Sequence, residues 1–465
     1  MADIEFKSKK ALGFFQLVMI NVIAVDSIRT LPFSAAYGFS LVFFYILAAL
    51  LFFIPTALVA AELGTGWPTT GGVYVWVREA FGKKWSLVVI WLNWIYNVVW
   101  YPTIIALIAG TAAYFFDPAL SDNKLYMGGS VVVLFWLATW LNLYGMKISG
   151  IISAIGAIIG TILPMVLISA LGFIWWKGGN PLAISVTADS FFPSMTNGNN
   201  LAFLTNVLFG LMGLEMAATH AADMKNPQRD YPKSLLVSVL IILATIVFAS
   251  LAIALVVPGN QLNLATGAMQ AFSLFLHSFN MGWAIPLVAG FIILGGISGM
   301  GAWIIGPTKG LMVASQDGSL PKILQKKNKH GVPVNILLIQ GVVVTILSLA
   351  FIIFPSVNSS FWILSAIAAQ LALLVYVFLF LAAIKLHHCR PEVKRSFKVP
   401  GKRWGMWICS GAGLLSSIGV IALGFIPPSQ IDLGNILSYE MWLIGGMILL
   451  CSVPFFIFKW KKRAS

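Results

Sequence analysis

The apolar residues of this chain form long continuous runs that recur from one end of it to the other. The runs consist of Leu, Ile, Val, Ala, Phe and Trp, and they lack the alternation of polar residues that is typical of half-buried strands. An α-helix of about 20 such residues crosses the hydrocarbon core of a bilayer. The pattern therefore predicts helical membrane spans at 12–36, 38–62, 85–115, 126–144, 148–176, 199–222, 233–257, 282–313, 335–354, 357–385, 405–426 and 436–460.

The composition agrees with a membrane protein of many spans. Hydrophobic residues make up 59% of the 465 positions and charged residues only 9%, whereas about a quarter of the residues in soluble domains are charged. A transmembrane β-barrel is not expected, because its segments are short and alternate in polarity. The first apolar run is longer than the core of a signal peptide, so we expect the N-terminus to be retained. The predicted fold class is an all-α integral membrane protein with about twelve transmembrane helices.

The net charge of +14 follows the predicted topology. All Lys and Arg residues except Arg29, Lys124 and Lys177 fall on one side of the predicted membrane. Basic residues resist translocation, so this bias predicts that both termini are cytoplasmic. It also indicates contact with anionic lipid rather than with nucleic acid. The sequence has three cysteines and no P-loop, HExxH or G-x-S-x-G motif, so we expect no enzyme activity, no metal site and no cofactor.

Two predicted spans are interrupted near their middle. The first contains "DSIRTLP" (Asp26 to Pro32), and the sixth contains Gly210 and Gly213 just before Glu215. Pro32 removes a helix donor and disfavours helical geometry in the preceding residue, so we expect a break at Pro32 or just before it. The two glycines weaken the sixth span in the same way, although close packing of helices would also explain them.

The two interruptions lie five spans apart. With an odd number of spans per repeat, the second five spans are inverted relative to the first, and matching broken spans in two halves are typical of a transporter's binding site. The sequence therefore predicts a 5+5 inverted repeat over residues 1–390, which holds spans 1–5 and 6–10. Residues 391–465 are predicted to form two C-terminal helices, spans 11 and 12, and a short cytoplasmic tail.

The charged residues of the first break admit two interpretations. In a helix, Asp26 and Arg29 share a face at spacing i, i+3 and would neutralise one another. In an unwound segment that spacing guarantees no contact, and Arg29 becomes a planar donor fork for a substrate carboxylate. Ser27 and Thr30 fit both interpretations as small hydroxyl residues. Together with Ile28 they complete the candidate binding segment.

Glu215 is predicted to lie near the membrane midplane. Asp223, at the predicted cytoplasmic end of the span, is about 12 Å away at 1.5 Å per helical residue. A carboxylate at that depth can bind a substrate ammonium or change its protonation state. The alternative is a structural carboxylate that is hydrogen-bonded inside the bundle, with Thr219 one turn later as its partner.

Several motifs resemble those of one transporter family. The run "GLEMAATHAADMKNPQRDYP" (Gly213 to Pro232) resembles the signature of the glutamate/γ-aminobutyrate antiporter family, which belongs to the amino acid–polyamine–organocation superfamily. Other motifs of that family are matched by "GWPTTGGVYVWVREAFG" (66–82), "GPTKGLMVASQDGSLPKIL" (306–324), "GVPVN" (331–335) and "RSFKVPGKRWGMW" (395–407). The resemblance covers nearly the whole chain. It implies the leucine-transporter-type inverted-repeat fold and the exchange of amino acids.

The resemblance also implies roles for single residues. Glu215 matches the family's glutamate in the sixth span, Trp303 an aromatic residue of the eighth span near the substrate, and Tyr376 a tyrosine of the tenth span. One position departs from the pattern. In "GGISGMGAW", Gly299 stands about where the glutamate/γ-aminobutyrate exchangers have a second acid. This departure leaves the pair of exchanged substrates open.

These observations predict a secondary amino acid transporter, an antiporter that works by alternating access in the cytoplasmic membrane of a bacterium. A proton-coupled amino acid symporter and a polyamine exchanger are the alternatives, so protons join amino acids and the lipid bilayer among the expected partners. A membrane receptor or sensor is the alternative of a different class. The expected substrate-binding residues are Asp26, Ser27, Ile28, Arg29, Thr30, Gly210, Gly213, Glu215, Trp303 and Tyr376, and Tyr96 and Trp100 are further aromatic candidates.

Overall fold

The computed structural model describes residues 13–68, 71–144, 155–193, 198–215, 227–316, 318, 320–428 and 431–464. Every regular element within these ranges is a helix. Eleven of the described helices are long and apolar enough to cross a membrane, and a shorter apolar helix, Leu201–Gly210, belongs to the sixth predicted span. The prediction of an all-helical membrane protein with about twelve spans is confirmed.

The helices follow the order of the predicted spans. The first five spans consist of α1 (Phe14–Val25), η1 (Ile28–Thr30) and α2 (Leu31–Ala35); η2 (Gly38–Ser40), α3 (Leu41–Ala48), η3 (Ala49–Phe53) and α4 (Ile54–Gly66); α6 (Lys83–Ala113); α7 (Lys124–Leu143); and η5 (Ile158–Ile162) with α9 (Leu163–Lys177). The later spans consist of η6 (Gly198–Phe203) with α11 (Leu204–Gly210); α12 (Pro227–Val256); η9 (Gly282–Ala284) with α14 (Ile285–Gln316); α15 (Val334–Ser348) with α16 (Ala350–Ile353); α17 (Val357–Cys389); α18 (Lys402–Leu423); and α19 (Ile436–Ala464). The connections carry α5 (Val73–Phe81), η4 (Pro118–Asp122), α10 (Ala188–Phe191), η8 (Gly259–Gln261), α13 (Gly267–Ser278) and η10 (Lys322–Gln325).

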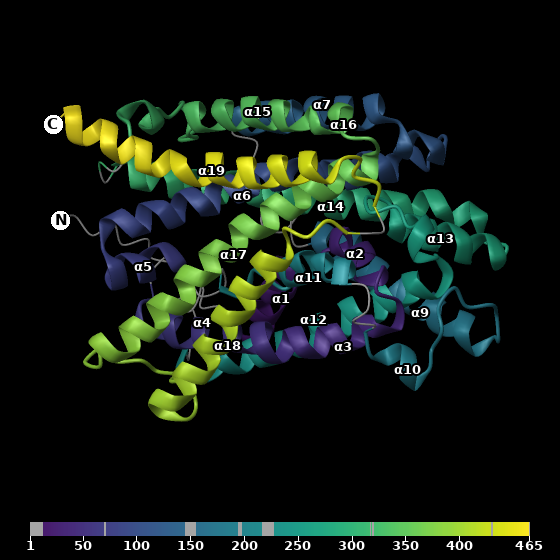
Figure 1. The fold of residues 1–465 in the computed structure, drawn as a ribbon, viewed down its shortest axis with the longest axis horizontal. Coiled ribbons are helices and arrows are strands. Elements are labelled where there is room, and N and C mark those ends of the chain that lie inside the picture. Colours follow the sequence, from purple (N-terminus) through teal and green to yellow (C-terminus); the bar gives the residue numbers. More distant parts are fainter. Residues whose placement is uncertain are drawn as a thin grey trace.

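Helices that are distant in sequence pack into two groups. In one group α12 lies against α1, α2 and α4, and in the other α6 lies against α7, α14 and α17. The helix α18 touches both groups, through α4 and α17. Figure 1 shows α7, α15 and α19 along one side of the molecule and the short elements α1, α2 and α11 in its interior. The interrupted spans are therefore surrounded by continuous helices.

The continuous helices differ in how much of their surface lies inside the protein. In the most apolar window of each helix, 83% of α6 and 72% of α17 is buried, against 28% of α18 and 17% of α19. The two C-terminal helices are thus peripheral and present most of their apolar side chains to the outside, as lipid contact requires.

The connections gather at two opposite ends of the long axis. Figure 1 places α5 and the connection between α17 and α18 at one end, and α10 and α13 at the other. The predicted topology assigns the first two segments to the same side of the membrane and the last two to the other side. The arrangement of the connections agrees with that assignment.

Candidate binding cavity

The first span is interrupted at Asp26 and Ser27. Their backbones are extended, with φ/ψ of −61°/126° and −149°/125°, between the end of α1 and the short helix η1. Pro32 lies within the first two residues of α2, where its fixed φ favours helix initiation and its missing N–H costs nothing. The break therefore lies several residues before Pro32, because the proline starts the second half of the span instead of ending the first.

The sixth span is interrupted after Gly210, where α11 ends. Gly213 has a φ of +126°, a region that is open only to glycine, and a Cβ there would lie 2.9 Å from the carbonyl oxygen of Ala24. A Cβ on Gly210 would lie 3.0 Å from the hydroxyl of Thr30. The glycines thus allow the two broken spans to approach each other, so close packing and backbone interruption are both present. The part of the sixth span that contains Thr219 lies outside the described residues.

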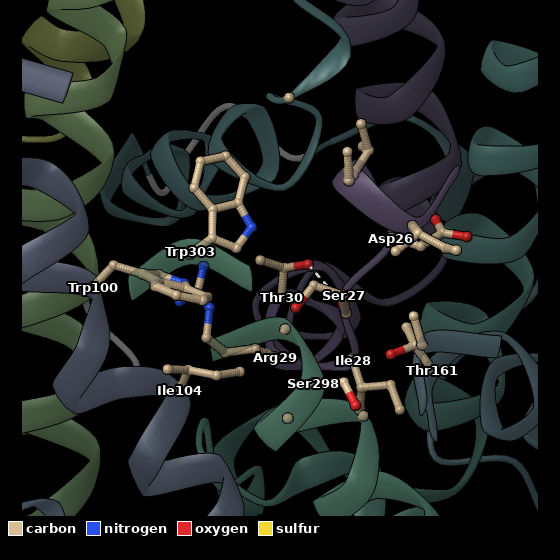
Figure 2. A pocket seen from close by; sticks show the side chains of 18 of the residues that line it. Asp26, Ser27, Ile28, Arg29, Thr30, Trp100, Ile104, Thr161, Ser298 and Trp303 are labelled. Carbon is tan, nitrogen blue, oxygen red and sulfur yellow. Dashed lines mark hydrogen bonds between the residues drawn. The ribbon is translucent and has the colours of Figure 1, made fainter. Parts of the chain in front are cut away.

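A cavity of about 420 Å³ lies between the two breaks and the helices α6 and α14. It is large enough for a small ligand, since ligand pockets start at about 300 Å³. Eight of the ten residues predicted to bind substrate line it: Asp26, Ser27, Ile28, Arg29, Thr30, Gly210, Gly213 and Trp303. Figure 2 shows the labelled residues of the first break around this cavity, with Trp100 and Trp303 on the side toward which Arg29 extends.

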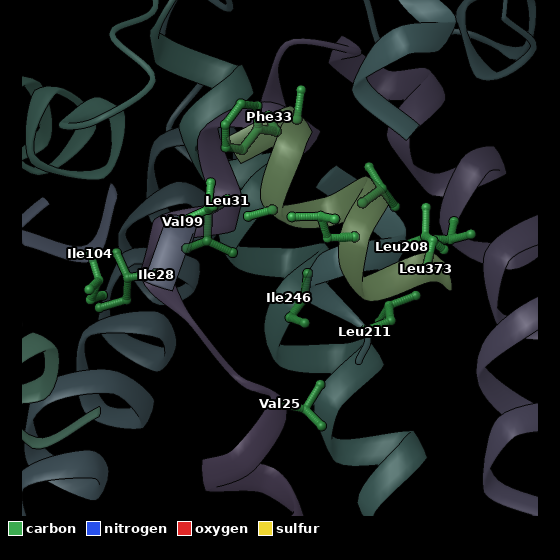
Figure 3. Close-up of a cluster of buried hydrophobic side chains, with 14 of the residues drawn as sticks. Val25, Ile28, Leu31, Phe33, Val99, Ile104, Leu208, Leu211, Ile246 and Leu373 are labelled. Atoms are coloured by element: carbon green, nitrogen blue, oxygen red, sulfur yellow. The ribbon is translucent and has the colours of Figure 1, made fainter. Parts of the chain in front are cut away.

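Buried apolar side chains pack around the two breaks. Figure 3 shows Val25, Leu31 and Phe33 of the first span among buried side chains that include Leu208 and Leu211 of the sixth span. Each of these side chains is at most 4% exposed. Their close packing holds the interrupted backbone in place, because helices within a membrane associate mainly through van der Waals contacts and interhelical hydrogen bonds.

Arg29 is buried without a carboxylate partner among the described residues. Its exposed fraction is 2%. One terminal nitrogen donates to the hydroxyl of Ser365 at 3.3 Å, and the guanidinium carbon lies 5.1 Å from the centre of the Phe209 ring. The buried Nε has no hydrogen-bond partner within the described part of the chain. This side chain therefore retains unused donor capacity at the wall of a cavity.

Asp26 turns away from Arg29. Both oxygens of its carboxylate accept from the hydroxyl of Thr245 on α12, at 3.1 and 3.0 Å, and Figure 2 shows Asp26 on the opposite side of the cavity. The interpretation of Asp26 and Arg29 as a mutually neutralising pair is wrong in this structure. The reason is the extended backbone at Asp26 and Ser27, which removes the helical periodicity that would place the two side chains on one face.

Glu215 and Tyr376 form a hydrogen bond with each other beside the cavity, and neither side chain lines it. The Tyr376 hydroxyl donates to the Glu215 carboxylate. The Gly213 N–H, freed by the break, donates to the Tyr376 oxygen at 2.9 Å and to Glu215 at 3.2 Å. Glu215 is 7% exposed. The pair therefore fixes the second break to α17 at the edge of the cavity.

Gly299 lies on the cavity wall contributed by α14. A Cβ on this residue would meet no atom within 4 Å, so the wall is open at the position where the sequence lacks an acid. Trp303, one turn later, is held by its carbonyl oxygen, which accepts from the Tyr101 hydroxyl at 2.9 Å. Among the described residues no group of three or more His, Cys, Asp or Glu side chains could hold a metal ion.

Sequence reasoning missed the residues that hold the candidate side chains. Ser365 and Thr245 contact Arg29 and Asp26 across 336 and 219 positions of sequence. A hydroxyl residue inside an apolar span was the only available signal, and many such residues bond to their own helix instead. Phe209 could have been suspected from its place next to Gly210.

Comparison with known proteins gives a consistent result over nearly the whole chain. The family model described as "Amino acid permease" matches residues 12–450. An uncharacterised transporter of Legionella pneumophila is 53% identical over 97% of both chains. A glutamate/gamma-aminobutyrate antiporter of Lactococcus lactis is 30% identical over 97% of this chain and 90% of its own length. A probable agmatine/putrescine antiporter of the same species is 26% identical over 95% and 93% of the two chains.

Proposed function

Because the chain belongs to the amino acid permease family, a family of transporters and not of enzymes, we propose that it exchanges amino acids across the cytoplasmic membrane of a bacterium by alternating access. The cavity between the two broken spans is the proposed substrate site. The chain is similar to a glutamate/gamma-aminobutyrate antiporter and to a probable agmatine/putrescine antiporter. Both relatives are named as antiporters, and this similarity supports the exchange mode.

The state of Arg29 is the observation that carries this proposal. An isolated charge is costly to bury, and the cost is recovered only when a counter-charge and further hydrogen bonds are supplied. Ser365 and the Phe209 ring supply neither a counter-charge nor a partner for Nε. The guanidinium fork matches the geometry of a carboxylate. We therefore assign Arg29 to the carboxylate of a bound amino acid.

The same charge argues against the polyamine alternative. Agmatine and putrescine are cations without a carboxylate, and a like charge in a buried site costs binding energy. Among the described residues, Asp26 lines the cavity and Glu215 lies beside it, and both are already engaged, Asp26 with Thr245 and Glu215 with Tyr376. A polyamine would have to displace one of these hydroxyls while it lay beside Arg29.

Proton-coupled symport is the second candidate, and Glu215 is the residue that favours it. A buried carboxylate bonded to a tyrosine and to the free backbone of a break is placed to exchange a proton during a conformational change. Under this alternative, uptake would need a proton gradient and no internal amino acid.

The proposal includes a domain division and an orientation. Residues 1–390 form the inverted-repeat core, and residues 391–465 add two peripheral spans. The close approach of the two breaks, Gly213 to Ala24 and Gly210 to Thr30, supports the repeat. The distribution of Lys and Arg supports cytoplasmic termini. Within the core, Asp26, Ser27, Ile28, Arg29, Thr30, Gly210, Gly213, Glu215, Trp303 and Tyr376 form or support the substrate site.

A competition experiment tests the proposal. The protein is reconstituted in vesicles, and a panel of labelled amino acids is offered with and without the same compound inside. Amino acids should compete for uptake, whereas putrescine and agmatine should not. Arg29→Gln should lose the uptake, and Lys177→Gln, which removes an exposed cation outside the cavity, should retain it. Competition by the polyamines with an unaffected Arg29→Gln variant would overturn the proposal.

A further inference from the structure

Three equally spaced side chains of α17 contact parts of the chain that are distant in sequence. They are Ser365, Tyr376 and His387, each eleven residues from the next. Eleven residues make about three helical turns and a rise of about 16 Å, so the three side chains lie on nearly the same face. Ser365 accepts from Arg29, and Tyr376 holds Gly213 and Glu215. One stripe of α17 thus contacts both broken spans.

The third contact lies at the end of α17, where His387 meets Glu62 of α4. The imidazole Nδ1 is 2.7 Å from one oxygen of the Glu62 carboxylate. The other oxygen accepts from the backbone N–H of Val399 at 2.8 Å. Arg395 completes the cluster, with a terminal nitrogen 3.6 Å from Glu62. Glu62 is 1% exposed, so the carboxylate depends on these partners for compensation of its charge.

The connection between α17 and α18 closes over this cluster. Arg395 donates to the carbonyl oxygens of Leu386 and Arg390 at 2.7 and 2.9 Å, and its guanidinium lies 5.3 Å from the centre of the Trp67 ring. Burial lowers the pKa of Arg395, and the Glu62 carboxylate acts in the opposite direction. Trp67 and Arg395, which belong to two distant motifs of the sequence, therefore meet at one end of the molecule.

The cluster joins the two groups of helices. α4 lies in the group of α12, α1 and α2, and α17 lies in the group of α6 and α14. Glu62 and Thr65 belong to α4, whereas His387 belongs to α17 and Phe397 to the connection that follows it. The Thr65 hydroxyl accepts from the Phe397 N–H at 3.3 Å. Arg395 ties this connection to the end of α17 through the carbonyl oxygen of Leu386, so a movement of α4 away from that end would break these contacts.

We propose that Glu62, His387 and Arg395 form a latch that opens and closes during transport, and that α17 couples this latch to the cavity through Ser365 and Tyr376. The proposal rests on the proposed function, because alternating access moves one part of the core against the other around the site. A substrate carboxylate that binds the unused donors of Arg29 pulls on the guanidinium that donates to Ser365, and so alters the first of the three contacts. Coupling of this kind is reciprocal, so the state of the latch also changes the affinity of the cavity.

A reversible cross-link tests whether the latch must open. In a variant whose three cysteines are replaced by alanine, Thr65→Cys and Phe397→Cys introduce two thiols at a site of direct contact. The protein is reconstituted, and exchange of the amino acid identified in the competition experiment is measured after oxidation and after reduction. Oxidation should lower the exchange rate at least tenfold, and reduction should restore it. Full cross-linking with an unchanged rate would overturn the proposal.

A second cysteine pair provides the matched control. Asn335 donates to the carbonyl oxygen of Ile323 at 2.7 Å, at the join between η10 and α15. Both residues lie outside the latch, so a cross-link between Asn335→Cys and Ile323→Cys should leave the exchange rate unchanged. A tenfold loss with this pair as well would show general damage by cross-linking and would count against the latch.

Hydrogen exchange provides a readout that needs no substrate. The amides of Phe397 and Val399 are bonded to Thr65 and Glu62, so they should exchange through the opening of the latch. Glu62→Gln should speed their exchange at least tenfold, and Glu392→Gln, at an exposed acid of the same connection, should not. If the double-cysteine variant exchanges no amino acid even after reduction, the proposed function has failed. Hydrogen exchange then tests the latch without a transport measurement. Amides that stay protected as long as those in the middle of α18, in the wild type and in Glu62→Gln, would overturn the latch.

Discussion

Replacing Arg29 should impair transport without destabilising the protein. Its guanidinium is 2% exposed and forms no ion pair with any described carboxylate. Breaking a buried ion pair costs about 3 to 5 kcal/mol, and even a whole buried ion pair can often be replaced by apolar side chains of similar volume without loss of stability. An isolated buried charge is costlier still, so its removal should not destabilise the protein. We therefore expect Arg29→Met and Arg29→Gln to unfold at the wild-type temperature or above it in the absence of substrate.

The loss of substrate affinity follows from the hydrogen bonds that the Arg29 guanidinium would form with the substrate. A hydrogen bond to a charged group contributes about 1.5 to 3 kcal/mol, and each 1.4 kcal/mol corresponds to a factor of ten in affinity. Loss of the guanidinium should therefore raise the half-saturation concentration of the amino acid by about 10- to 100-fold. Arg29→Lys should also be impaired, because an ammonium lacks the planar fork that holds both carboxylate oxygens.

Two measurements on the same preparations check this reasoning. Thermal unfolding in detergent gives the stability, and uptake into vesicles at graded concentrations of amino acid gives the half-saturation constant. The double variant Asp26→Asn, Arg29→Gln should transport as poorly as Arg29→Gln alone. A double variant with normal uptake, or an Arg29→Met protein that unfolds well below the wild type, would show that Arg29 serves the structure and not the substrate.

Further predictions concern the second break. Glu215→Gln should fold but should lower the exchange rate several-fold and flatten its pH profile, because the charge that strengthens the bond to Tyr376 is lost; wild-type uptake at every pH would contradict this. Tyr376→Phe should give a similar loss, and the double variant should lose little more, as a double-mutant cycle of uptake rates would show. Gly213→Ala should destabilise the protein by about 1 to 3 kcal/mol, because the residue has a φ of +126° and its new Cβ would lie 2.9 Å from the carbonyl oxygen of Ala24. In the matched control Gly299→Ala the new Cβ meets open space, so the unfolding temperature should not change.

The membrane architecture could be predicted from the sequence because hydrocarbon imposes a length and a composition on every span. The two interruptions were also visible, since proline and glycine act locally on the backbone. The sequence did not fix the position of the first break, because a proline either ends a helix or begins one. The structure shows that Pro32 begins α2.

The side-chain contacts of the candidate site could not be predicted in the same way. Asp26 and Arg29 share a face only if the backbone between them is helical. Their hydrogen-bond partners therefore depend on where the helix is interrupted. The bonds from Arg29 to Ser365 and from Tyr376 to Glu215 join residues more than 160 positions apart. No local pattern encodes such contacts, because they follow from the packing of α17 against the interrupted spans.

Exchange itself is tested most directly by uptake of a labelled amino acid into vesicles that are either empty or preloaded with the same unlabelled amino acid. An exchanger must return its cavity to the outside with a substrate bound. Preloaded vesicles should therefore take up label at least ten times faster than empty ones, with no imposed ion gradient. Equal uptake into both kinds of vesicle, driven by a proton gradient, would rule out obligatory exchange and would identify the protein as a symporter.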